Sequence, residues 1–176
     1  MFAAEIRKRR ILMRRGCPEW RWHLDEMFVK ISGITHYLWR AVDHESEVLE
    51  VVATKRRDRQ AASGFLKKLT KTYGRPHVVV TGKLRSCGAA IQVIGNAARQ
   101  ECEGRGINNR PENSHQPLQQ RERAMLRFWR IKTLQKFAAV HGAIHNHFNQ
   151  QRHLTSRETY KQNRAAALVE WKSLLA

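Results

Sequence analysis

The sequence predicts an α/β protein in which helices flank a mixed sheet. Three strand-like runs in the first third of the chain are separated by short turns, which is typical of antiparallel strands. The run at 77–81 is almost wholly apolar and follows a helical segment, as expected for a buried parallel strand reached by a crossover. The predicted element order is β-β-β-α-β-α-(β)-α-α.

The first strand, residues 20–31, has apolar residues on both sides of a period-two pattern. This pattern predicts a central strand covered on both faces. One side carries Trp20, Trp22, Leu24 and Phe28, and the other carries Met27, Val29 and Ile31.

Asp25 lies on the Met27 side of this strand. An ionised carboxylate withdrawn from water costs several kcal/mol unless it is paired, hydrogen-bonded or bound to a cation. Asp25 therefore needs a partner. The strand alone leaves two alternatives open, a metal ion and a buried Asp–Arg pair.

The remaining elements follow from turn and capping signals. Ser32-Gly33 predicts a hairpin turn into a strand at 36–42, and a third strand follows at 48–54. Asp58 is expected to cap a helix that ends at Gly74. We also predict a helix at 83–94, a weak strand at 98–103, a long helix from Glu122 to Phe148, and a last helix capped near Thr155.

The composition points to a polyanionic partner. The net charge is +18 over 176 residues, and Lys and Arg release counterions when they neutralise phosphates. The chain also has 41% hydrophobic residues and five Trp, which favours a folded core over a disordered basic tail. There is no secretory signal or run of eighteen apolar residues, so we expect a soluble cytoplasmic protein without a membrane partner.

Cysteine and histidine residues are weaker signals. Cys17, Cys87 and Cys102 include no C-x-x-C pair, so we interpret them as reduced thiols. His141 and His145 are spaced i, i+4 on a helix and are an alternative metal pair, but a third ligand is not evident.

Three segments carry a family resemblance: Trp22-His23-Leu24-Asp25-Glu26 with Lys30, the run from Tyr37 to Asp43, and Asn108-Asn109-Arg110-Pro111-Glu112-Asn113-Ser114-His115. In this order and spacing they resemble a DDE-type insertion-sequence transposase of the IS-six (IS-twenty-six-like) family. The resemblance extends from about Trp20 to the C-terminus. It implies a ribonuclease-H-like fold, DNA cleavage and strand transfer.

The resemblance also implies a metal site. In the family, Asp, Asp and Glu hold two Mg²⁺ ions, and Asp25 and Glu112 match the first and last of these ligands. Carboxylates are hard oxygen ligands suited to Mg²⁺ or Mn²⁺, and two ions stabilise the entering and leaving oxygens of phosphoryl transfer.

This chain departs from the family pattern at three places. Gly82 stands where the second metal-binding Asp is expected, so we predict weak metal binding and impaired catalysis. Gln119 replaces a Lys or Arg seven residues after Glu112, which removes a charge-assisted phosphate contact. Only 24 residues precede Asp25, so we expect a truncated copy without the family's helix-turn-helix region.

The expected organisation has three parts: residues 1–19 as a basic arm left from a lost DNA-binding region, 20–150 as the catalytic domain, and 151–176 as a C-terminal helical tail. The expected partners are double-stranded DNA and another copy or an intact transposase, which implies association with the nucleoid. Candidate DNA contacts are Lys55, Arg56, Arg57, Arg110, Arg121, Arg123, Arg127 and Arg130.

Two functions compete at this stage. One is a transposase catalytic domain, impaired by Gly82. The other is a basic fragment that binds DNA or pairs with intact transposase without chemistry. A third function, RNA binding, lacks the aromatic sheet motif or Gly-x-x-Gly clamp that would support it.

Overall fold

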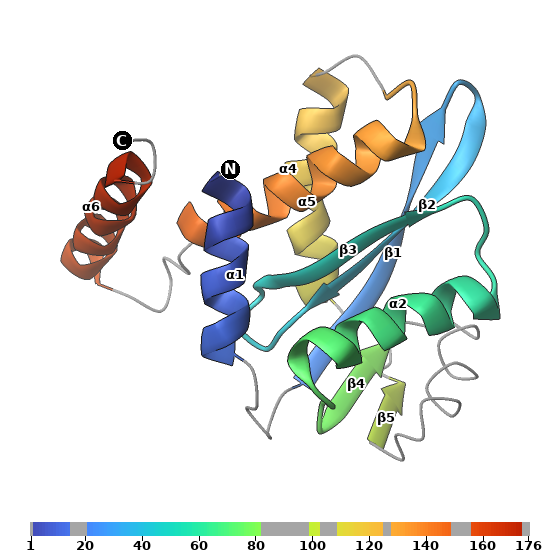
Figure 1. Ribbon diagram of the computed structural model, residues 1–176, viewed down its shortest axis with the longest axis horizontal. Coiled ribbons are helices and arrows are strands. Elements are labelled where there is room, and N and C mark those ends of the chain that lie inside the picture. The colour runs from blue at the N-terminus through green and yellow to red at the C-terminus, as the bar shows by residue number, and fades with distance from the viewer. Residues whose placement is uncertain are drawn as a thin grey trace.

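The computed structural model describes residues 2–14, 21–81, 99–102, 109–124, 128–148 and 156–173. Five strands form one mixed sheet in the order β3-β2-β1-β4-β5 (Figure 1). The elements in chain order are α1 (Phe2–Arg14), β1 (Arg21–Ile31), β2 (Ile34–Val42), β3 (Val48–Thr54), α2 (Arg59–Tyr73), β4 (Val78–Thr81), β5 (Arg99–Cys102), α4 (Asn109–Ala124), α5 (Ile131–Phe148) and α6 (Arg157–Ser173).

The central strand β1 pairs antiparallel with β2 and parallel with β4, as the sequence predicted. The hairpin between β1 and β2 turns at Ser32 and Gly33, whose φ angles of 49° and 81° both lie in the left-handed region that a tight hairpin requires. The weak fifth strand is confirmed as β5. The helix predicted at 83–94 lies outside the described residues.

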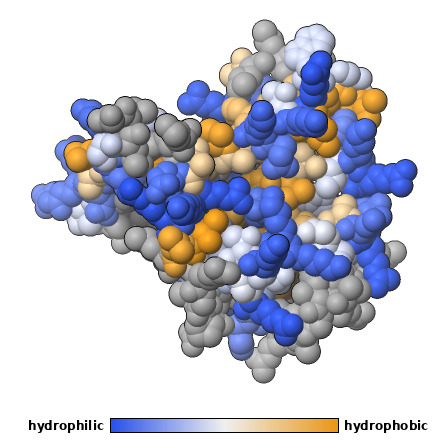
Figure 2. All heavy atoms as spheres, in the orientation of Figure 1, coloured by the Kyte–Doolittle hydropathy of each residue, from blue (hydrophilic) through white to orange (hydrophobic). Residues whose placement is uncertain are grey.

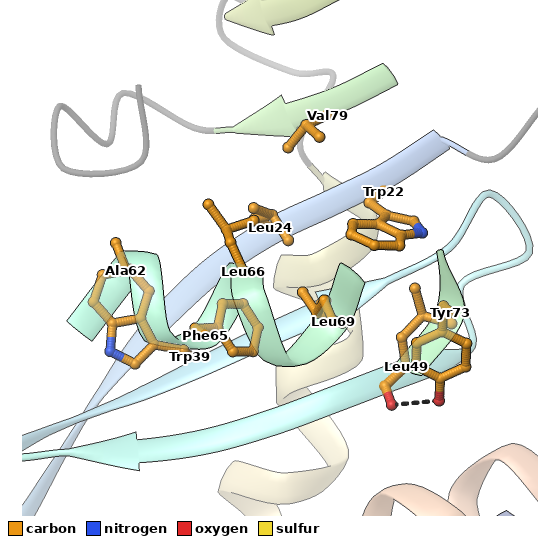
Figure 3. Packing of buried hydrophobic residues seen from close by; sticks show 11 residues of the cluster. Trp22, Leu24, Trp39, Leu49, Ala62, Phe65, Leu66, Leu69, Tyr73 and Val79 are labelled. Carbon is orange, nitrogen blue, oxygen red and sulfur yellow. Dashed lines mark hydrogen bonds between the residues drawn. The ribbon is translucent and has the colours of Figure 1, made fainter. Parts of the chain in front are cut away.

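One face of the sheet packs against α2. Trp22 and Leu24 of β1 and Trp39 of β2 meet Phe65 and other apolar residues of α2 in a single cluster (Figure 3). The helix begins as predicted, because the Asp58 carboxylate accepts a hydrogen bond of 2.8 Å from the backbone of Ala61.

The opposite face packs against α4 and α5. Met27 and Val29 of β1 lie in one cluster with Leu118 of α4 and Leu134 of α5. The prediction of one helix from Glu122 to Phe148 was therefore wrong, because α4 ends at Ala124 and α5 begins at Ile131. The two helices cross at a large angle in Figure 1, so both can lay an apolar side on the same sheet face, which one straight helix could not do.

Phe28 also differs from the prediction. Its side chain is 59% exposed instead of buried with Trp22 and Leu24. The hairpin of β1 and β2 continues beyond the part of the sheet that α2 covers (Figure 1). There the Phe28 ring packs edge-on against Tyr37, with a centroid distance of 5.5 Å.

The basic N-terminal segment forms helix α1, which packs against α5 and α2 and sends side chains to the edge strand β3. Ile6 is buried, and Arg7 forms an ion pair with the buried Glu50 of β3. Arg10 pairs with Glu47 at 2.5 Å and donates a 2.8 Å hydrogen bond to the carbonyl of Asn146 in α5. These cations of α1 are therefore used within the fold.

Two side-chain amides of α5 bind the backbone of the edge strand β3. Asn146 accepts from the Val48 N–H and donates to the Val48 carbonyl, both at 2.8 Å. Gln135 accepts from Ala53 at 2.7 Å and donates to Val51 at 2.8 Å. The amides satisfy backbone groups that an edge strand would otherwise leave open to another chain.

The C-terminal helix α6 lies beside the end of α5. His147 Nε2 donates to the carbonyl of Ala167 at 2.8 Å, and the rings of Phe148 and Trp171 are 5.3 Å apart. Ser156 caps the helix by accepting from Thr159.

In the described ranges, we find no helix that combines the length and apolarity needed to cross a membrane.

Replacing Asn146 should test the attachment of α5 to the sheet edge. We expect Asn146→Leu to lower the free energy of unfolding by about 2 kcal/mol, because two hydrogen bonds are lost and buried backbone groups are left unpaired. Urea denaturation measures the effect. Asn163→Leu, at an exposed position of α6, is the matched control. Equal stability of the two variants would contradict this function of Asn146.

Candidate active site

The site is built around Asp25 at the middle of β1. Its Cα partner in the ladder is Arg40 of β2, and the preceding residue, Leu24, pairs with Thr81 at the end of β4. The Asp25 side chain is 20% exposed, and its Oδ2 lies 3.7 Å from Nδ1 of His115 in α4. The strand and helix therefore bring a carboxylate and an imidazole together where β4 ends.

Arg40 is a buried cation on the strand beside Asp25. It is 1% exposed, and its Nε and Nη2 have no hydrogen-bond partner among the residues that the structure describes. Burial disfavours the charged form and lowers the pKa of Arg40 to about 10, so the guanidinium is still charged at neutral pH. Arg40 is thus the cross-strand neighbour of Asp25, whose carboxylate lies 3.7 Å from His115.

The positive charge of Arg40 helps to lower the pKa values of three histidines. Burial, with Arg40 as a second cause, lowers the pKa of His115 to about 3. Burial, Arg40 and His141 lower the pKa of His145 to about 4, and burial with Arg40 and Arg121 lowers that of His141. All three imidazoles are therefore neutral at pH 7, and the contact of His115 with Asp25 is a polar contact rather than an ion pair.

Glu26 is a further acid that the sequence reasoning passed over. Its side chain is 4% exposed and pairs with Arg57, whose guanidinium also lies over the Phe28 ring at 5.9 Å. Burial raises the pKa of Glu26 to about 7; Arg57 opposes this shift and Asp25 adds to it. The signal was available in the sequence, because adjacent residues of a strand covered on both faces cannot both point to solvent.

The other expected metal ligands are only partly described. Glu112 belongs to α4, one turn before His115, but its side chain lies outside the described residues. Gly82 follows Thr81 directly and also lies outside them. In the ranges that are described, no three His, Cys, Asp or Glu residues are grouped as a metal site would require. The His141 and His145 rings stack at 6.0 Å instead.

The candidate DNA contacts fall into two groups. Lys55 and Arg56 are exposed in the connection between β3 and α2, where Arg57 is engaged by Glu26. The second group is on α4 and just before α5: Arg121, Arg123 and Arg130 are exposed, the Arg110 side chain is not described, and Arg127 lies outside the described residues.

Solved structures with a similar fold are retroviral integrases. A chain of the simian T-cell lymphotropic virus intasome has a TM-score of 0.54 at 18% identity, over 78% of this chain and 51% of that one. The HTLV-2 integrase catalytic core domain has a TM-score of 0.53 at 15% identity, and the match covers 79% of this chain and 91% of that one. The catalytic core domain of BIV integrase has a TM-score of 0.51 at 13% identity, and the match covers 86% of this chain and 97% of that one. The chain therefore has the ribonuclease-H-like fold of integrase catalytic cores.

A family model of IS240-type transposases, described as a DDE domain, matches residues 19–151. The chain belongs to this family of insertion-sequence transposases, which confirms the resemblance inferred from the sequence.

The curated relatives include transposases from Staphylococcus aureus. Those of the IS431mec element and of IS257 in transposon Tn4003 are each 32% identical over 107 residues, which is 58% of this chain and 48% of each relative. An uncharacterized Yersinia pseudotuberculosis protein is 33% identical over 73 residues, 40% of this chain and 68% of that protein. The chain spans about half the length of the transposases it matches.

Replacing Arg40 should raise the histidine pKa values. We expect Arg40→Met to raise the pKa of His115 above about 3 and that of His145 above about 4, because a buried positive charge is removed while burial remains. Folding stability should then decline less steeply as pH falls below 6.5, because the native histidines take up protons sooner. NMR titration of the imidazoles measures the shift.

The matched control for this experiment is Arg59→Met, at an exposed position of α2. Unchanged titration of both histidines in Arg40→Met would contradict the placement of the Arg40 charge beside them.

Proposed function

We propose that this chain is the catalytic domain of an insertion-sequence transposase that binds DNA but is impaired in cleavage and strand transfer. Family membership supports the general function. The observation that carries the impairment is the pairing of Leu24 with Thr81, because Asp25 follows Leu24 in β1 and Gly82 follows Thr81 in the sequence. The residue after Leu24 supplies a carboxylate, whereas the residue after Thr81 has no side chain.

Asp25 and Glu112 are the residues that would hold Mg²⁺ or Mn²⁺. A bound ion would supply Lewis-acid activation of the nucleophile and stabilisation of the leaving oxygen. The surroundings fit such an ion poorly. The donor set lacks its second Asp, and the charged Arg40 lies one strand away from Asp25. We therefore propose weak metal binding.

The basic surface supports DNA binding. Hydrophilic residues cover most of the described part of the face seen in Figure 2, with smaller hydrophobic areas between them. The net charge of +18 favours phosphate contacts regardless of sequence. Among the candidate contacts we give less weight to Arg57, because its guanidinium already contacts the buried carboxyl group of Glu26. Lys55, Arg56, Arg121, Arg123 and Arg130 are the exposed cations that remain.

The proposed partners are duplex DNA and a second transposase chain, either identical or intact. The named relatives support assembly, since one neighbour belongs to an intasome and the HTLV-2 core is described in dimeric and trimeric forms. The second candidate function is a fragment that binds DNA or pairs with intact transposase without any chemistry. Gly82 favours this second function, and a metal site that is restored by Gly82→Asp would favour the first.

Restoring the missing carboxylate tests the metal site. We expect the unmodified chain to give no strand transfer with pre-cut ends in Mg²⁺ or Mn²⁺, and Gly82→Asp to bind Mn²⁺ more tightly in calorimetry, because a hard oxygen ligand is added. Gly82→Asn controls for size without the charge. Efficient joining by the unmodified chain would contradict the impairment. No gain of Mn²⁺ binding by Gly82→Asp would contradict the positions assigned to Asp25 and Glu112.

Salt dependence tests the DNA contacts. We expect duplex affinity to fall steeply between 50 and 200 mM salt, by about 10³-fold if six or more phosphates are contacted. Replacing Lys55 and Arg56 together by Ala should reduce the salt slope by about two, because each contact contributes about one. The control pair is Arg7 and Arg10, which already form ion pairs within the fold. Binding that does not change with salt would exclude phosphate contacts as its basis.

A further inference from the structure

A groove of about 650 Å³ lies where α4, α5 and α6 meet. Its lining includes two cations, Arg121 of α4 and Arg164 of α6, and several aromatic rings. None of its described lining residues is Asp or Glu. The groove is therefore positive and partly aromatic, in a region that neither the metal ligands nor the β3–α2 cations occupy.

The two arginines of the groove are available to a ligand. Arg121 is exposed and has no acidic partner within the described ranges. Arg164 is also exposed, and its contact is a 3.3 Å hydrogen bond to the hydroxyl of Tyr160, again without an acid nearby in that part of the chain. By contrast, Arg7 and Arg10 of α1 are paired with glutamates. Unneutralised guanidinium groups suit phosphate oxygens.

The aromatic lining offers stacking surfaces. The rings of His141 and His145 are nearly parallel, 12° apart, and both line the groove with Tyr160. Burial and Arg40 help to keep these imidazoles neutral at pH 7, so they add aromatic surface rather than charge to the groove wall. A positive groove with aromatic surfaces is the arrangement that binds single-stranded nucleic acid, since unpaired bases stack while the backbone meets cations.

Helix α4 carries residues of both the candidate active site and the groove. His115 touches Asp25, and Arg121 comes six residues later, about 9 Å along a helix.

We propose that this groove, on the helix that also carries His115, binds an unpaired segment of a DNA strand, with phosphates at Arg121 and Arg164 and bases against Tyr160 and the two histidines. The inference rests on the proposed function only in taking DNA as the ligand. It adds a preference for single-stranded over duplex DNA and names the residues that produce this preference.

The test compares a fluorescent single-stranded oligonucleotide with its duplex in anisotropy titrations. The groove variant is Arg121→Ala with Arg164→Ala. The matched control is Arg157→Ala with Lys161→Ala, which removes two exposed cations of α6 that lie outside the groove lining and outside the proposed duplex contacts. We expect the groove variant to lose about tenfold in single-strand affinity and less than about threefold in duplex affinity, with the control nearly unchanged.

Variants of Tyr160 distinguish the contribution of base stacking from that of charge. We expect Tyr160→Ala to weaken single-strand binding by about tenfold and Tyr160→Phe to retain it, because the phenyl ring still stacks. Equal losses in groove and control variants, or equal losses for single strand and duplex, would overturn the proposal.

Two outcomes locate a failure. If the unmodified chain binds neither duplex nor single strand, the proposed function fails and the groove assignment fails with it. If duplex binding is normal but the groove variants bind single strands as the unmodified chain does, only the groove assignment fails. A change in oligomeric state of those variants by light scattering would then identify the groove as a contact between copies.

Discussion

The arrangement of the molecule depends on how α5 is held against β3. Gln135 and Asn146 stand eleven residues apart, about three turns, and each amide makes two hydrogen bonds to the strand backbone. Such bonds are directional, so they set the position of the helix along the strand as well as its distance from it. His141 and His145 lie between these two attachment points on α5. The attachment of α5 therefore also positions the wall of the groove that these two histidines form.

The face of the sheet beneath α4 and α5 carries both packing and charge. Met27, Val29 and Leu38 form an apolar cluster with the two helices. Asp25 and Arg40 interrupt that surface as cross-strand neighbours. A buried cation in this position is costly, and its consequences extend to three histidines whose pKa values it helps to lower. The charge of Arg40 therefore affects both His115 at the candidate active site and the two histidines of the groove.

Much of the fold could be predicted from local signals. The hairpin at Ser32-Gly33 and the helix capped by Asp58 depend on turn and capping chemistry within a few residues, and both were predicted correctly. The single long helix was wrong, because its apolar spacing continues through Ala124 while packing on the sheet requires two directions. Phe28 was misplaced because the pattern of a strand does not show where its covering helix ends.

The sequence by itself determined the family, the position of Asp25 on a covered strand, and the glycine where a second acid is expected. These are statements about residue identity and order, which the chain carries directly. Only the tertiary structure decided which charges are used within the fold and which remain for a ligand. Arg7, Arg57 and Arg121 are the same residue type, but the first two contact distant glutamates and the third lines an open groove. Electrostatic pairing acts through space, and residues far apart in the sequence become neighbours only when the chain folds.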